Sequence, residues 1–142
     1  MRIADVLRTK GSGVVTVSPE TTVADLLAGL AEHNIGAMVV TGPDGLAGIV
    51  SERDVVRRLH ERGADLLARP VSEIMTKVVA TCTPADSVDD LSVLMTRRRV
   101  RHVPVLQDGT LAGIVSIGDV VKSRMEELET HQEQLHAYIS RG

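Results

Sequence analysis

The residues best suited to chemistry are a serine and an aspartate that recur in one pattern: glycine, two hydrophobic residues, serine, two variable residues, aspartate. The pattern spans Gly48 to Asp54 and again Gly113 to Asp119. A serine at a strand end brings a hydroxyl and backbone N–H groups to a helix N-terminus, whose partial positive charge favours an anion such as phosphate. The aspartate one turn later offers a carboxylate that suits the two hydroxyls of a ribose. Ser-x-x-Asp is also a plain helix cap, and its recurrence does not decide between the two interpretations.

Other chemical groups in the chain do not form a recognisable catalytic or metal-binding pattern. Cys82 is the single cysteine, which excludes an internal disulfide and favours the reducing cytoplasm. The histidines are scattered without metal-ligand spacing, and none stands at a fixed offset from Ser51 or Ser116 that would activate a hydroxyl. We therefore expect no enzyme activity, no metal and no catalytic cofactor, in a cytoplasmic protein.

The composition excludes several classes of partner. The 142 residues are 43% hydrophobic, yet Tyr138 is the one aromatic residue, which argues against nucleic-acid binding by base stacking. A net charge of -3 offers little attraction to phosphate backbones, so DNA binding through the arginine run at 97–101 is a weak alternative. No segment has the apolar length that spans a membrane, and the first residues do not form a signal peptide. We expect no nucleic-acid or membrane partner.

An internal repeat organises the chain. Shifting the sequence by 65 places aligns 14–57 with 79–122 and gives 16 identities in 44 positions. A weaker echo at a spacing of 68 sets Ile3–Leu7 against Val71–Met75. These alignments divide the chain into a first repeat over 1–62 with an N-terminal helical segment, a second repeat over 63–122 with its lead-in helix, and a C-terminal helical extension over 123–142.

Each repeat has the same predicted order of strand, helix, strand, strand and helix. The β-branched runs at 14–17 and 78–82 stop at a proline and indicate strands, and Thr22 and Ser87 are predicted to cap the helices that follow. Apolar runs joined by turn residues predict a hairpin in each repeat, before helices capped by the serines of the first paragraph. Because one such unit is too small to bury its helices alone, we expect an α/β (α+β) fold in which two β-α-β-β-α repeats pack face to face about a pseudo-two-fold axis.

The C-terminal extension continues the last helix to about Ile139 and carries one apolar stripe. Its members alternate in steps of four and three, which is the heptad spacing of helices that pair; they are Val121, Met125, Leu128, Gln132, Leu135 and Ile139. The sequence leaves open whether this stripe packs on its own repeat or on a second chain.

The repeat, the two serine–aspartate motifs and the strand Val103-Pro104-Val105 together resemble the tandem CBS-domain module, named after cystathionine β-synthase, over residues 1–122. The resemblance implies that an adenosine-containing ligand such as AMP, ATP, NAD or S-adenosylmethionine binds in two clefts between the repeats. It also implies a homodimer, because such modules commonly pair.

In that family, each cleft combines the first and middle strands of one repeat with the Ser/Thr-x-x-Asp turn of the other. Carried onto this sequence, the residues of the first cleft are Val79, Ala80, Val100, Pro104, Ile49, Ser51, Arg53 and Asp54. Those of the second cleft are Val14, Val15, Ile35, Val39, Ile114, Ser116, Gly118 and Asp119. The residues that would line the base are aliphatic in both clefts, which fits a chain with one aromatic ring.

The two clefts differ in charge. Arg101 and His102 stand beside the first cleft, where the resembling family places cations that bind phosphate, and Arg53 faces them. The second cleft has small residues at the corresponding positions, and Val39 replaces the strand proline. We expect the first cleft to be the stronger nucleotide site.

The sequence thus predicts a regulatory, energy-sensing module that binds an adenine nucleotide and acts through a dimer on a partner protein. The alternative is a ligand-free dimerisation and interaction scaffold of the same fold, in which the serines and aspartates serve as caps alone.

Overall fold

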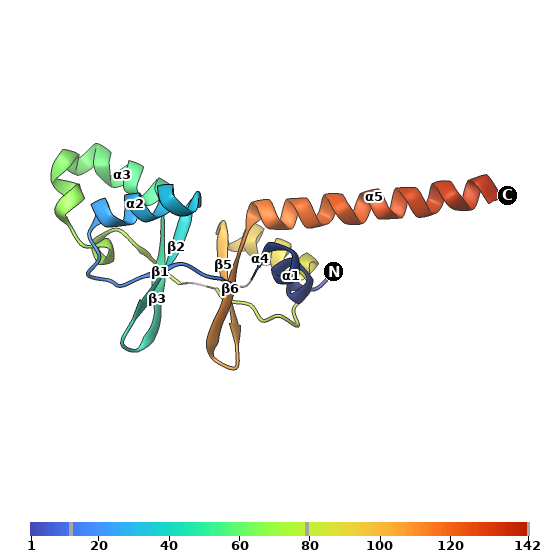
Figure 1. Ribbon diagram of the computed structural model, residues 1–142, viewed down its shortest axis with the longest axis horizontal. Helices are drawn as coiled ribbons and strands as arrows, with labels where there is room; N and C mark the ends of the chain where they lie inside the picture. The colour runs from blue at the N-terminus through green and yellow to red at the C-terminus, as the bar shows by residue number, and fades with distance from the viewer. Residues whose placement is uncertain (12, 79, 142) are drawn as a thin grey trace. The chain divides into compact units, whose positions relative to one another are not determined.

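The computed structural model describes residues 1–11, 13–78 and 80–141, and it contains two compact units. One is Gly13–Ala80, called the first-repeat unit below. The other joins Met1–Ser12 to Thr81–Gly142 and is called the second-repeat unit. Both units contain helices and strands (Figure 1), which confirms the mixed α/β fold.

The first-repeat unit contains a four-stranded sheet. Its elements are β1 (Thr16–Val17), α2 (Val23–His33), β2 (Ala37–Gly42), β3 (Gly45–Ser51), α3 (Glu52–Arg62), 3-10 turns at Gly63–Ala68 and Val71–Glu73, and β4 (Thr76–Lys77). The strand order is β1-β2-β3-β4, with β1 parallel to β2 and the other neighbours antiparallel. The core forms where the apolar face of α2 packs with the sheet and with the two 3-10 turns.

Among its described residues, the second-repeat unit repeats this plan with fewer paired strands. Its elements are α1 (Ile3–Lys10), α4 (Val88–Arg98), β5 (His102–Gln107), β6 (Thr110–Ser116) and α5 (Ile117–Arg141). Cys82 forms a parallel bridge with Val105. The strand predicted over 78–82 is therefore represented, among the described residues, by this one bridge. The partner strand carries Pro104 where the first repeat has Val39, and proline has no N–H for a ladder.

The strand pairs of the two hairpins are related by the same spacing of 65 residues that the sequence repeat shows. Met38 pairs with Val50 as Val103 pairs with Val115, and a β-bulge interrupts both hairpins at the same place. The predicted caps are confirmed too, since the side chains of Thr22 and Ser87 accept hydrogen bonds from the N–H groups three residues later. Both α2 and α4 end at a residue in the left-handed conformation, which closes each helix in the same way.

The lead-in segments are exchanged between the repeats. The N–H of Ile3 donates to the carbonyl of Asp86 at 2.9 Å, and the N–H of Val71 donates to the carbonyl of Thr21 at 2.8 Å. Asp86 and Thr21 are 65 positions apart, so these bonds are equivalent. Three buried residues of α1 complete the core of the second-repeat unit: Ile3, Val6 and Leu7. The spatial units thus group α1 with the second repeat, and the sequence division at residue 62 stays a prediction.

The long C-terminal helix is confirmed, since α5 runs for 25 residues. Over the described ranges, no helix is long and apolar enough to cross a membrane.

Candidate functional site

The serine–aspartate motifs lie where a strand meets a helix, at the β3–α3 and β6–α5 junctions. At the first junction the Ser51 N–H donates to Oδ2 of Asp54 at 2.8 Å, and the Ser51 hydroxyl donates to the same oxygen at 3.0 Å. The corresponding distances for Ser116 and Asp119 are 2.8 and 2.9 Å. In return each serine Oγ accepts from the aspartate N–H. Both motifs are therefore capping boxes, which fix the orientation of the two carboxylates.

Capping does not use up the carboxylates. The bonds of both boxes end on Oδ2, and a carboxylate has about four acceptor positions. Oδ1 of Asp54 lies 3.5 Å from the Thr76 hydroxyl, at the limit of a hydrogen bond. The helix-cap interpretation of the motif is thus confirmed, and it remains compatible with a ribose acceptor on Oδ1.

The first N–H of each helix following a motif is already used inside its unit. In each case it donates to the carbonyl of the residue just before the first strand of the hairpin. The Glu52 N–H donates to the Gly36 carbonyl at 3.0 Å, and the Ile117 N–H donates to the Arg101 carbonyl at 2.9 Å. The third N–H belongs to the aspartate and donates to serine Oγ. Within the described residues, this narrows the predicted anion site in the first turn to the second N–H, which belongs to Arg53 and to Gly118.

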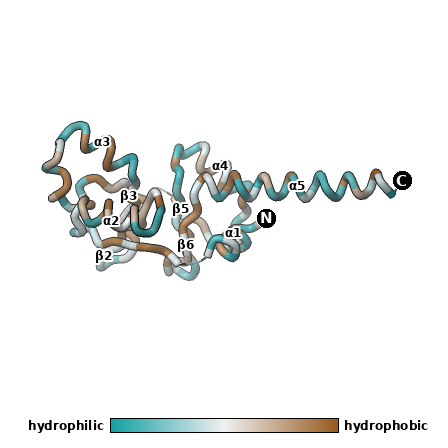
Figure 2. Tube along the Cα trace, turned by 45° about the horizontal axis from the view of Figure 1, so that its top comes forward, coloured by the Kyte–Doolittle hydropathy of each residue, from teal (hydrophilic) through white to brown (hydrophobic). Residues whose placement is uncertain are grey.

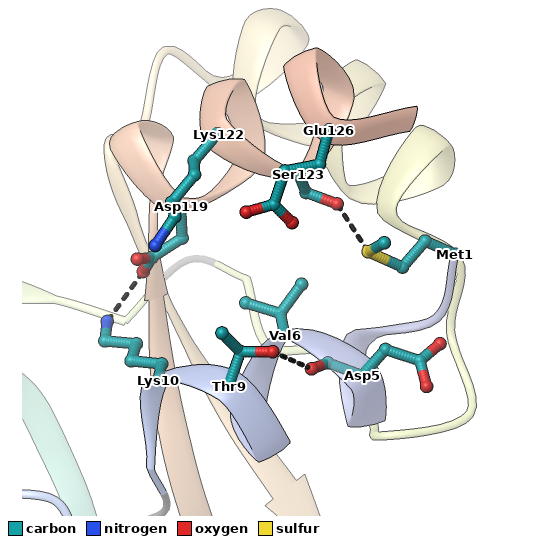
Figure 3. Close-up of a pocket in the computed structure, with 9 residues that line it drawn as sticks. All are labelled: Met1, Asp5, Val6, Thr9, Lys10, Asp119, Lys122, Ser123 and Glu126. Carbon is teal, nitrogen blue, oxygen red and sulfur yellow. Dashed lines mark hydrogen bonds and ion pairs between the residues drawn. The ribbon is translucent and has the colours of Figure 1, made fainter. Parts of the chain in front are cut away.

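Lys10, the last residue of α1, is a neighbour of Asp119 that the sequence analysis missed. Its Nζ lies 2.6 Å from Oδ2 of Asp119 and 2.9 Å from the carbonyl oxygen of Ile114. Figure 3 shows this pair at one end of a pocket of about 180 Å³ between α1 and α5. Lys10 precedes its partner by 109 residues, so neither repeat spacing points to it. It supplies a cation beside Asp119 that the sequence comparison of the two clefts did not include.

The electrostatics of Asp119 follow from these contacts. Burial raises the pKa of its carboxyl, but the hydrogen bonds from Lys10 and Ser116 and the charge on Lys10 together lower the pKa by more. Asp119 is therefore ionised throughout the neutral range and pairs with a half-exposed ammonium group.

The motif glycines make room for the exchanged lead-in segments. A Cβ on Gly113 would lie 2.5 Å from Cδ2 of Leu7, and one on Gly48 would lie 2.6 Å from the backbone oxygen of Thr76 and 3.1 Å from Sδ of Met75. The contacts with Leu7 and Thr76 are closer than a Cβ atom tolerates. A Cβ at either position therefore forces a neighbour to shift: the backbone of Thr76 at Gly48, and the flexible end of the Leu7 side chain at Gly113. The pattern alone did not indicate this packing constraint.

The other predicted site residues divide between the two units. In the first-repeat unit, Val14, Ile49 and Ala80 are half-buried, Arg53 is exposed and Val39 is buried. In the second-repeat unit, Ile114 and His102 are half-buried, Arg101 and Gly118 are exposed and Pro104 is buried. Val79 lies outside the described residues. Each predicted cleft draws on both units, so the assembly of either cleft stays a prediction.

Three of the predicted base-lining residues also have a packing role. Val15 and Ile35 lie against the core of the first-repeat unit, and Val100 lies against the core of the second. Part of each side chain is therefore committed to its own unit. Among the described residues, no three histidine, cysteine or acidic side chains gather closely enough to hold a metal ion.

Known proteins share this arrangement. The family model described as "CBS domain" matches residues 3–61 and 71–126. The mitochondrial CBS domain-containing protein CBSX3 of Arabidopsis thaliana is 37% identical over 149 residues, which cover 99% of this chain and 72% of that protein.

Solved structures agree with the sequence matches. The CBS-domain protein ATU1752 from Agrobacterium tumefaciens has a TM-score of 0.82 and 46% identity, and the match covers 87% of this chain and 99% of that one. The CBS domain protein PAE2072 from Pyrobaculum aerophilum, solved in complex with AMP, has a TM-score of 0.74 and 28% identity, with 84% and 89% covered. Since the two segments matched by the family model coincide with the two repeats, this chain belongs to the family of CBS-domain proteins and carries two such domains.

Proposed function

We propose that this chain is a regulatory module that binds an adenine nucleotide of the AMP, ATP or NAD type in clefts between its two CBS repeats. The observation that carries the proposal is the hydrogen-bonded serine–aspartate box at the start of α3 and of α5, with Oδ1 of each carboxylate outside the box. The AMP bound by the relative from Pyrobaculum aerophilum supports the same class of ligand.

The residues have separate roles in this proposal. Asp54 accepts hydrogen bonds from the ribose hydroxyls, while Ser51 holds its carboxylate in place. Arg101 and His102 neutralise the phosphate, since charge-assisted bonds are the strongest that a phosphate can receive. Asp119 and Ser116 form the corresponding ribose site of the second cleft. The cleft with Asp54 is the stronger of the two in this proposal, because an arginine and a histidine serve its phosphate side.

In this proposal the regulatory signal is a change in the homodimer. Nucleotide binding changes the geometry of a homodimer, and the changed dimer reports the energy state of the cell to a partner protein. No bond is made or broken in the ligand, so the protein acts as a sensor and not as an enzyme.

Isothermal titration with AMP tests the proposal directly. Asp54→Asn keeps the shape of the side chain but removes its charge, and a hydrogen bond to a charged group contributes about 1.5–3 kcal/mol. We expect AMP affinity to fall by about ten- to a hundredfold. Asp44→Asn, in the exposed hairpin turn, is the matched control and should leave the affinity unchanged. Equal affinities for both variants would refute the role of Asp54.

A ligand-free scaffold of the same fold is the second candidate, and the exposed apolar stripe of α5 favours it. The two candidates differ in one measurement. A sensor takes up AMP, ATP or NAD with measurable heat and a raised melting temperature. A scaffold shows neither with any of the three, although it still self-associates.

A further inference from the structure

The C-terminal half of α5 makes no contribution, over its described residues, to the buried core of the second-repeat unit. Every described residue after Glu127 is exposed. The stripe predicted from the sequence is exposed with it: the accessible fractions of its apolar side chains lie between 52% and 68% for Val121, Met125, Leu128, Leu135 and Ile139. Figure 2 shows hydrophobic bands recurring along this helix between hydrophilic ones. Five large apolar side chains on one bare helix are more than a surface normally exposes in a line.

The unit's own packing uses a different face of α5. The buried residues of the helix are Val120 and Ser123, and Glu127 on the same face is half-buried. Because each residue turns an α-helix by about 100°, the stripe lies roughly 120° around the helix from this face. The stripe is therefore not a fringe of the unit's core but a second, separate apolar face.

We propose that this face pairs in parallel and in register with α5 of a second copy of this chain, forming a two-stranded coiled coil over 121–139. The steps of four and three place Met125, Gln132 and Ile139 at heptad positions a, and Val121, Leu128 and Leu135 at positions d. This pairing deepens the homodimer of the proposed function and does not depend on nucleotide binding.

The polar residue of the stripe favours the parallel arrangement. In a parallel pair, Gln132 meets Gln132 of the second copy, and the two amides can bond to each other. In the antiparallel arrangement that overlaps the whole stripe, Gln132 instead meets Leu128. That contact would bury an amide against an apolar side chain and leave its hydrogen bonds unmade.

The charges beside the stripe point the same way. In a parallel pair, the g position of one helix faces the e position of the next heptad on the other, which sets Arg124 beside Glu129 of the second copy. The antiparallel arrangement sets Glu129 against Glu129, where like charges repel. In the single chain, Arg124 is about half exposed and pairs with Asp89 and Glu127 of its own unit, so the contact with Glu129 of the second copy shares a guanidinium that is already partly engaged.

The oligomeric state of the full chain tests this pairing. Leu128→Glu/Leu135→Glu places two charges in the seam, and Thr130→Glu/Ala137→Glu adds the same two charges on the opposite side of the helix. By light scattering we expect the unchanged chain and the control to be dimers. The seam variant should associate at least tenfold more weakly, with unchanged helical content by circular dichroism. A monomeric unchanged chain, or a seam variant as dimeric as the control, would overturn the proposal.

Cysteine cross-linking tests the direction. With Cys82→Val as background, Leu135→Cys should form a disulfide-linked dimer on mild oxidation, because identical d positions meet in a parallel pair. Thr130→Cys, facing away from the seam, should remain uncross-linked. A Leu135→Cys chain that links only to a Met125→Cys chain would show an antiparallel pair and refute the parallel arrangement. AMP titration of the seam variant separates the test of pairing from the test of the proposed function. If the monomeric variant binds AMP, the nucleotide site does not depend on the coiled coil.

Discussion

The two serine–aspartate boxes have the same hydrogen bonds between serine and aspartate, but the aspartates differ in the further residue that each one contacts. Both hold the serine N–H 2.8 Å from the aspartate Oδ2. Asp119 then pairs with Lys10 at 2.6 Å, whereas Asp54 has the Thr76 hydroxyl at 3.5 Å. The difference arises because each box faces the lead-in segment that precedes the other repeat. Repeat symmetry therefore determines how the carboxylate is held, and the lead-in residue determines the charge beside it.

The motif glycines should give the largest difference between the repeats. Gly48→Ala pushes a methyl group against the backbone oxygen of Thr76, which cannot move without the strand, and we expect a loss of about 2–3 kcal/mol in the free energy of unfolding. Gly113→Ala meets the end of the Leu7 side chain, which can rotate, and should cost about 1 kcal/mol. Urea unfolding measures both. Equal losses would mean that the two lead-in segments are equally rigid.

Arg101 tests the difference in charge between the two predicted clefts. Arg101 and Gly36 are equivalent, and both carbonyls accept the first N–H of a helix, so the backbone role does not depend on the side chain. Arg101→Ala should therefore keep the fold and remove a phosphate partner. We expect AMP affinity to fall about tenfold, the value of one charge-assisted bond, while adenosine affinity changes less than about twofold. Titration with the two ligands measures this, and equal losses would contradict a phosphate role for Arg101.

The contacts that Lys10 and Thr76 make with the two aspartates should change the free energy of unfolding by less than the glycine substitutions do. Lys10→Met removes an ion pair that is partly exposed, so we expect a loss of only about 0.5–1 kcal/mol in the free energy of unfolding at pH 7. Thr76→Val removes a bond at the distance limit and should cost less than about 0.3 kcal/mol. Urea unfolding of both variants beside the unchanged chain gives the comparison, and a larger loss for Thr76→Val would reverse it.

The Lys10 effect should also depend on pH. The pKa of Asp119 is lowered in the folded chain, so the stability that it contributes is complete above its unfolded pKa of about 3.9 and is lost as the pH falls through the folded pKa. The difference between Lys10→Met and the unchanged chain should therefore shrink in urea unfolding below about pH 4. A difference that persists undiminished at pH 2.5 would show that Lys10 acts by packing and not by charge.

Sequence reasoning reached much of this fold because the repeat carries local signals. Neighbouring residues alone indicate the caps at Thr22 and Ser87 and the two hairpins. Because the repeat spacing is 65, the pattern found in one repeat can be compared with the pattern in the other. The heptad spacing likewise predicted a helix reaching Ile139. Local order was predictable wherever the interacting residues lie within one turn or one hairpin.

The parts that could not be predicted depend on contacts between distant segments. Nothing near Lys10 indicates that α1 packs into the second-repeat unit, because its neighbours in sequence belong to the first repeat. The same exchange explains why the motif glycines lack room for a Cβ. The bonds from the first helical N–H groups to the carbonyls of Gly36 and Arg101 extend each hairpin by one residue, and the serine–aspartate pattern does not indicate them.

A small effect on the free energy of unfolding is also expected where the repeats are closest, at Cys82 and Val17. Each stands in a parallel pairing with its equivalent neighbour, Val105 or Val40. Cys82 is buried, and burial followed by the charge on Asp86 raises the pKa of its thiol to about 12, so it remains protonated and behaves as a small apolar side chain. Cys82→Val places in the second repeat the residue that the first already has, and urea unfolding should change by less than about 1 kcal/mol. A loss above about 2 kcal/mol would show that the two cores have diverged at a position where their backbones agree.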